Sequence, residues 1–148
     1  MRKRVYISVV VVALIGLFAA STAKAQISRP LIANIPFDFQ VGKATLPAGE
    51  YVVSRVFPYS GQAVLRLRSE DGRAVAVVNM ITVRSKAQDR AKLIFHRYGS
   101  EYFFAEAWSG GESTGLLAPK SRAERATQRE LAGLKPQMQE VVLNIVEK

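Results

Sequence analysis

The sequence predicts a mainly β protein, an antiparallel β-sandwich or small β-barrel of six to eight strands with one C-terminal helix. Three observations support this fold class. From Ile35 to Trp108, short apolar runs show period-2 alternation with polar residues. Gly, Pro, Ser and Asp separate these runs, as chain turns require. After Pro119 the composition changes to Ala, Arg and Glu, which are good helix formers.

The first predicted strand, Ile35 to Val41, places Phe37, Phe39 and Val41 on one face and polar side chains on the other. In the segment 46–49, Leu-Pro-Ala-Gly, proline presets φ for a turn and glycine accepts a positive φ. The chain then enters a second strand at Glu50. Both strands are therefore predicted to have one buried face.

A third strand, Ala63 to Ser69, carries leucines on one face and Arg66 and Arg68 on the other, so its outer face is predicted to be basic. Glu70-Asp71-Gly72 predicts a tight hairpin turn, because Asp-Gly suits positive φ. The fourth strand, Ala74 to Val83, is apolar on both faces. We expect it to lie in the centre of a sheet.

The fifth and sixth strands, Lys92 to Tyr98 and Glu101 to Trp108, flank Gly99-Ser100, a good two-residue hairpin turn. A two-residue turn would fix four cross-strand pairs: Tyr98 with Glu101, Arg97 with Tyr102, His96 with Phe103 and Phe95 with Phe104. Strict alternation also predicts one shared core face, made of Leu93, Phe95, Tyr102, Phe104 and Trp108.

The C-terminal part is predicted to contain a short strand, a helix and a closing strand. The short strand is Leu116 to Ala118. The helix covers about 121–134, where Ser121 is the N-cap and Glu124 completes a capping box. The apolar residues of 139–147 fit either a helix or a strand, and their β-branched side chains favour the strand.

The first 25 residues have the pattern of a cleavable secretory signal peptide. Arg2-Lys3-Arg4 precedes an apolar run from Val5 to Ala20, and Ala23-Lys24-Ala25 places small residues before the cleavage site. We therefore expect cleavage between Ala25 and Gln26 and a secreted or periplasmic protein. The run is shorter than the roughly 20 residues of a membrane-spanning helix, so we expect membrane contact only before cleavage.

Composition narrows what the exported part can do. Residues 26–148 fit a single β-rich domain, and losing the signal lowers the formal net charge from +9 to +5. The sequence has no cysteine and one histidine, which excludes thiol chemistry and multi-histidine metal centres. We predict no metal or other cofactor. The partner is unknown: the positive balance fits either an envelope polymer or envelope protein as partner or a simple solvated surface, and export argues against nucleic acid.

Two blocks of the chain resemble a group of uncharacterised exported proteins of Gram-negative soil bacteria. The first is Ile35-Pro36-Phe37-Asp38-Phe39-Gln40-Val41-Gly42 followed by Leu46-Pro47-Ala48-Gly49-Glu50-Tyr51, and the second spans 92–103. The likeness covers most of the exported part. It implies export and one small β-rich domain, and it brings no known activity, substrate or cofactor to any position.

The best candidate for a ligand-binding residue is Glu106. Alternation puts it on the same face as Phe104 and Trp108, where a carboxylate among aromatics needs a partner, and Arg97 across the hairpin could supply one. These four residues form the predicted site. A structural interpretation, in which Glu106 is a strand-end charge or part of a buried pair, remains open.

An enzyme would need paired carboxylates, and Asp38, Glu101 and Glu106 are available without a supporting motif. His96 has no accompanying nucleophile motif, and we expect it to be structural. We therefore predict no catalytic residues and no enzyme, but a non-catalytic binding or interaction module. The alternative is a small carboxylate-dependent hydrolase or lyase that acts on an envelope glycan.

Overall fold

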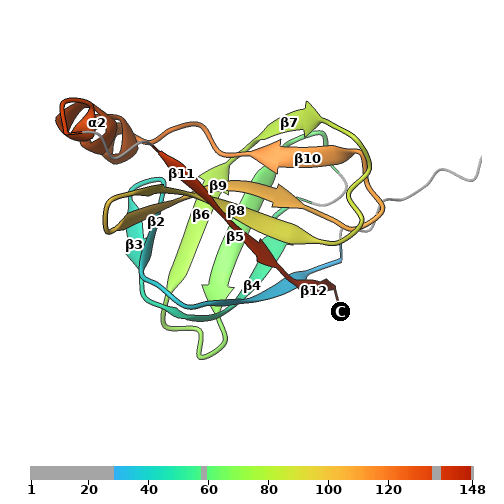
Figure 1. Cartoon of the computed structure of the whole chain (residues 1–148). Coiled ribbons are helices and arrows are strands. Elements are labelled where there is room, and N and C mark those ends of the chain that lie inside the picture. The colour runs from blue at the N-terminus through green and yellow to red at the C-terminus, as the bar shows by residue number, and fades with distance from the viewer. Residues whose placement is uncertain (1–28, 58–59, 135–137, 148) are drawn as a thin grey trace, which may run out of the picture.

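The computed structural model describes residues 29–57, 60–134 and 138–147, and the predicted signal peptide lies outside these ranges. The described chain forms two sheets that pack face to face, with helix α2 (Arg122–Leu131) at one end (Figure 1). The predicted mainly β fold with one helix in the C-terminal region is confirmed. No helix within the described ranges is long and apolar enough to span a membrane.

The first sheet, here sheet A, has five strands in the order β12-β1-β4-β5-β6. Their bounds are β1 Leu31–Ile35, β4 Gly49–Arg55, β5 Val64–Ser69, β6 Val75–Asn79 and β12 Val146–Glu147. All neighbouring strands in this sheet are antiparallel.

The second sheet, sheet B, contains the path β11-β8-β9-β10-β7 and a hairpin, β2–β3, that joins β9. The bounds are β2 Phe39–Val41, β3 Ala44–Leu46, β7 Ile81–Arg84, β8 Lys92–Tyr98, β9 Glu101–Trp108, β10 Thr114–Leu117 and β11 Gln139–Asn144. The β2–β9 contact is the parallel one, through Gln40 and Phe103.

Two chain segments pass directly from one sheet to the other and close the sides of the sandwich. Strand β6 of sheet A leads through Met80 into β7 of sheet B, and β11 leads through Ile145 into β12. Strands that bend in this way form the corners between packed sheets. The prediction of one central strand over Ala74 to Val83 is therefore wrong, because the segment divides at Met80 and both halves lie at sheet edges.

The predicted first strand, Ile35 to Val41, also divides between the sheets. Ile35 ends β1 in sheet A, and the chain enters sheet B at Phe39. Pro36 lies at the break, consistent with its lack of a backbone N–H for the ladder. Asp38 follows and accepts a hydrogen bond from the amide of Ala48 at 2.8 Å, which fixes this crossing to the 46–49 turn.

The predictions for the hairpin at Gly99, the helix cap and the C-terminal segment agree more closely with the structure. The four cross-strand pairs around Gly99 are confirmed, and Gly99 has a φ of 62°. Ser121 is the N-cap of α2, and its side chain accepts from the amide of Glu124 at 3.0 Å. The helix ends at Leu131, short of the predicted 134. The C-terminal segment is extended, as favoured, although it bends at Ile145.

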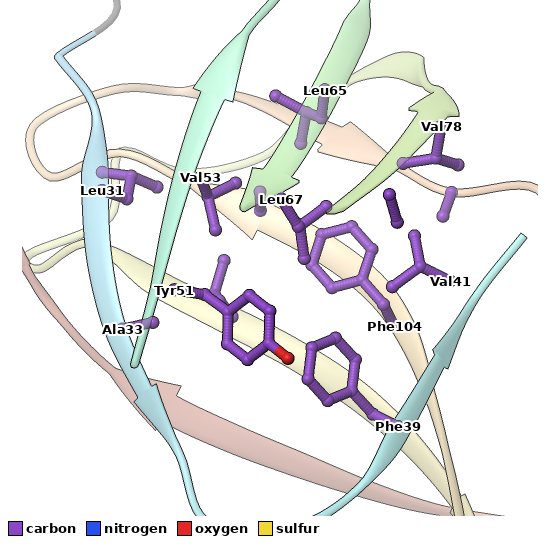
Figure 2. Close-up of a cluster of buried hydrophobic side chains, with 14 of the residues drawn as sticks. Leu31, Ala33, Phe39, Val41, Tyr51, Val53, Leu65, Leu67, Val78 and Phe104 are labelled. Carbon is purple, nitrogen blue, oxygen red and sulfur yellow. The ribbon is translucent and has the colours of Figure 1, made fainter. Parts of the chain in front are cut away.

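Large side chains fill the space between the sheets. The rings of Phe39, Tyr51 and Phe104 meet there, as Figure 2 shows, and each is at most 3% exposed. Phe39 contacts both Tyr51 and Phe95 edge to face, with ring centroids 5.2 and 5.4 Å apart. Such pairs add to the stabilisation that burial provides. The interior is a packed aromatic and aliphatic core.

Candidate functional site

A β-bulge separates the residues of the site predicted from sequence. Ile94 pairs with Glu106, whereas the next residue, Phe95, pairs with Phe104, so Ala105 is an extra residue in β9. An extra residue reverses the alternation of side chains beyond it. The predicted face shared by Phe104, Glu106 and Trp108 is therefore wrong.

Phe104 points into the core, where its ring lies 5.7 Å from that of Phe95. Beyond the bulge, Ala107 belongs to the core, whereas Glu106 and Trp108 lie on the outer face of sheet B with their partners Ile94 and Lys92. The structure thus brings two predicted site residues together and places the third on the opposite face.

Glu106 and Trp108 form a hydrogen bond with each other. The indole Nε1 donates to Oε2 of Glu106 at 2.6 Å. Trp108 is only 6% exposed, and its ring lies flat against Gly115 of the neighbouring strand β10. The partner of Glu106 is therefore this indole, and the carboxylate and ring form a packed pair on the sheet surface.

Arg97, the fourth predicted site residue, is exposed near the hairpin turn. Its Nε donates to the carbonyl of Gly99 at 2.8 Å, and its guanidinium carbon lies 5.5 Å from the centre of the Tyr102 ring. It pairs across the hairpin with Tyr102, as predicted. These contacts hold Arg97 at the turn and away from Glu106.

The other two carboxylates considered for catalysis also have local partners. Asp38 accepts from the Ala48 amide, as described above, and Glu101 accepts from the hydroxyl of Thr127 at 2.7 Å. Thr127 belongs to α2, so the second contact helps to place the helix against the start of β9. Each contact has a structural role in the fold.

A buried polar cluster lies where α2 packs on sheet B. Oε1 of Glu124 is 2.7 Å from Nδ1 of His96 and accepts a hydrogen bond from the Tyr98 hydroxyl at 3.1 Å. All three residues are at most 8% exposed. Lys120 lies at the edge, with its Nζ 3.4 Å from the Tyr98 oxygen.

This cluster affects the ionisation of Tyr98. Burial is the largest cause, and the negative charge of Glu124 and its hydrogen bond add to it, so that the pKa of Tyr98 is raised to about 12. Sequence reasoning identified His96 and Glu124 separately, as a strand residue and a capping-box residue. It missed their contact, because nothing local in the sequence shows which strand a helix packs against.

Within the described ranges, exposed apolar side chains lie together on the outside of sheet A. Val75 is 47% exposed and Val77 58% exposed on the edge strand β6. They pair across the sheet with Arg68 and Arg66 of β5. We call this surface the valine–arginine face; it consists of the outward side chains of Ile32, Val52, Arg66, Arg68, Val75 and Val77.

The pairing registers arrange this face in rows across the strands. One row runs from Ile32 through Val52 and Arg68 to Val75. Among the described residues, neither Arg66 nor Arg68 makes an ion pair or a hydrogen bond through its side chain. Both arginines therefore have donors without a side-chain partner in the described chain, and each pairs with an exposed valine. The guanidinium of Arg68 lies over Gly72 at the β5–β6 turn.

The sequence contained a signal for this face. The apolar residues on both sides of 74–83 and the basic outer side of the third strand were both visible. The inward residues Ala76 and Val78 are in the core, as alternation requires. The outward valines, however, were assigned to burial in a central strand, whereas the structure exposes them.

The residues of the first resembling block have structural roles in this fold. Phe37 stacks on Tyr102 with the ring centroids 3.8 Å apart, and the Tyr51 hydroxyl donates to the carbonyl of Pro47 at 2.7 Å. Phe39 and Val41 are in the core. Comparisons with protein families, curated proteins and solved structures give no match to this chain.

Proposed function

We propose that this chain is an exported, non-catalytic interaction module that binds an acidic surface of a partner protein through the valine–arginine face. One observation carries the proposal: Arg66 and Arg68 have no acidic partner in the described chain, yet exposed valines pair with both of them. Unpaired guanidinium groups beside apolar side chains suit a surface that a partner covers.

The packed interior supports a binding surface on the outside. Aromatic and aliphatic side chains occupy the space between the sheets, where a small-molecule carrier would hold its ligand. The charge and the signal-peptide pattern agree with a basic protein that acts outside the cytoplasm. The resemblance to uncharacterised exported proteins supports the same location.

The chemistry of the face favours an acidic protein over other partners. Arginine binds carboxylates through two parallel hydrogen bonds and is enriched in protein interfaces. A second copy of this chain would bring Arg66 and Arg68 against the same two charges. A glycan would bind best to exposed aromatic rings, and the residues that define this face include none.

A direct test uses a short synthetic peptide of alternating glutamate and valine, labelled with a fluorophore. Fluorescence anisotropy measures its binding to the purified protein. We expect the Arg66→Gln Arg68→Gln double variant to bind about a hundred-fold more weakly or worse, since it loses at least two charge-assisted hydrogen bonds and each costs roughly 1.5–3 kcal/mol. Val77→Ser should weaken binding separately, by removing apolar contact.

The matched control is Arg122→Gln Arg125→Gln, which removes the same charge from the exposed side of α2. It should bind the peptide as the wild type does. Equal loss in both double variants would show that only net charge matters, and would refute a specific face. Binding of anionic vesicles or an anionic polysaccharide through Arg66 and Arg68, without peptide binding, would refute a protein partner.

A further inference from the structure

Two arginines, Arg29 before β1 and Arg55 at the end of β4, lie at the same end of the sandwich. Arg55 ends β4, in alternation with the inward residues Tyr51 and Val53. Leu31, the first residue of β1, pairs with Val53, and the exposed Arg29 lies two residues before Leu31. The pairing of β1 with β4 thus brings two like charges to the same cavity.

Both arginines line a small cavity at this end. Its volume is about 40 Å³, and its floor is apolar. Figure 2 shows three of the floor residues, Leu31, Val53 and Leu65, on the adjacent strands β1, β4 and β5. The wall also includes the hydroxyl-bearing residues Ser54, Ser109 and Thr114.

No acidic residue lines this cavity. Among the described residues, neither Arg29 nor Arg55 makes an ion pair or a hydrogen bond through its side chain. Two like charges that line one small cavity repel each other, and Arg55 is only partly open to solvent. An anion between the two guanidinium groups would remove this repulsion and satisfy their donors.

We infer that this cavity binds the carboxylate end of a small aliphatic acid. A water molecule needs roughly 10–15 Å³ of such volume, so the cavity has room for about three water-sized atoms, the number in a carboxylate group. Phosphate has no apolar part that could contact the floor of the cavity. The planar guanidinium matches a carboxylate, and the leucine and valine floor can contact the alkyl carbon.

The probe is sodium propionate, compared with sodium chloride at equal ionic strength. We expect propionate to raise the Tm of the purified protein by about 3 °C near saturation, because a ligand that binds the folded state stabilises it. Arg29→Gln and Arg55→Gln should each abolish the rise. Arg122→Gln, at the opposite end of the molecule, should keep it.

Unfolding of a variant would not obscure the result. Removing one of the two like charges at the cavity should leave the anion-free protein at least as stable as the wild type. In the wild type, the side-chain Nε–Hε NMR signals of Arg29 and Arg55 should shift on titration with propionate, and that of Arg122 should not.

Three outcomes would overturn the inference: an equal Tm rise in chloride, a rise that survives Arg55→Gln, or a stronger effect of phosphate. The site is independent of the proposed function. Arg66→Gln Arg68→Gln should keep the response to propionate, and Arg55→Gln should keep the binding of the glutamate–valine peptide. Failure of one proposal therefore leaves the other standing.

Discussion

Nδ1 of His96 on strand β8 lies 2.7 Å from Oε1 of Glu124 on helix α2. The chain has one histidine, and this contact joins it to the helix across 28 positions of sequence. The same carboxylate oxygen accepts from Tyr98. Glu124 therefore serves two purposes, since its backbone amide completes the N-cap and its side chain anchors the helix to the sheet.

Removing this carboxylate should release the helix. Glu124→Ala leaves His96 and the Tyr98 hydroxyl buried without their acceptor, which should cost about 2–4 kcal/mol of stability. Urea denaturation measures the loss, and amide exchange should speed up in α2 more than in β4 or β5. Glu130→Ala, an exposed glutamate on the same helix, is the control. Equal effects of the two substitutions would contradict an anchoring role.

The raised pKa of Tyr98 should make the folded protein less stable at alkaline pH. Its pKa of about 12 in the folded protein lies above the value near 10 in an unfolded chain. Between pH 10 and 12 the unfolded state has lost this proton and the folded state has not, so the free energy of unfolding falls by up to about 1.4 kcal/mol per pH unit. Below pH 10 this contribution is complete.

Urea titrations at a series of alkaline pH values test this. Tyr98→Phe should be less stable at neutral pH, because it loses a hydrogen bond, but its stability should fall less steeply above pH 10. Burial also raises the pKa of Tyr51, so a second part of the slope should remain in the single variant. An unchanged slope in Tyr98→Phe would show that this proton is not linked to folding.

The sequence predicted well where neighbours along the chain decide the structure. The Gly99 hairpin register and the Ser121 cap each depend on residues within a few positions of one another, and both are correct. The division of 74–83 at Met80 and the entry of β1 into sheet A depend on which sheet a strand joins. Period-2 alternation carries no information about that choice.

The candidate site was harder still, because one inserted residue decides it. Alternation assigns Glu106 to the face of Phe104, and the bulge at Ala105 reverses the assignment. A bulge has no strong sequence signal when the extra residue is an alanine in an apolar strand. The pair of Arg29 and Arg55 was equally hidden, since their proximity depends on the non-local pairing of β1 with β4.

The proposed export leads to a prediction about the mass of the protein. If signal peptidase cleaves between Ala25 and Gln26, the protein recovered from the periplasm or the medium should have the mass of residues 26–148. Ala23→Asp Ala25→Asp should block cleavage, because the peptidase requires small residues at both positions. Intact-mass spectrometry reads the result. An exported protein that still begins at Met1 would mean that the segment is retained as an anchor.

The close packing of Trp108 on Gly115 should make this glycine sensitive to substitution. A Cβ at position 115 would come within 2.4 Å of the indole Cδ2, and the hydrogen bond to Glu106 restrains the ring from moving aside. We expect Gly115→Ala to lower stability by about 1–3 kcal/mol, as overpacking does. Gly61→Ala is the control, since a Cβ there meets nothing within 4 Å.

Tryptophan fluorescence shows whether the substitution moves the ring, because Trp108 is the only tryptophan. If the methyl group displaces the ring, emission of folded Gly115→Ala should shift to longer wavelength as the indole leaves its buried position. Glu106→Gln should keep the ring in place, since an amide oxygen can still accept from Nε1. If Gly115→Ala has wild-type stability and emission, the added methyl group does not displace the ring, and the close packing of Trp108 on Gly115 does not limit this position.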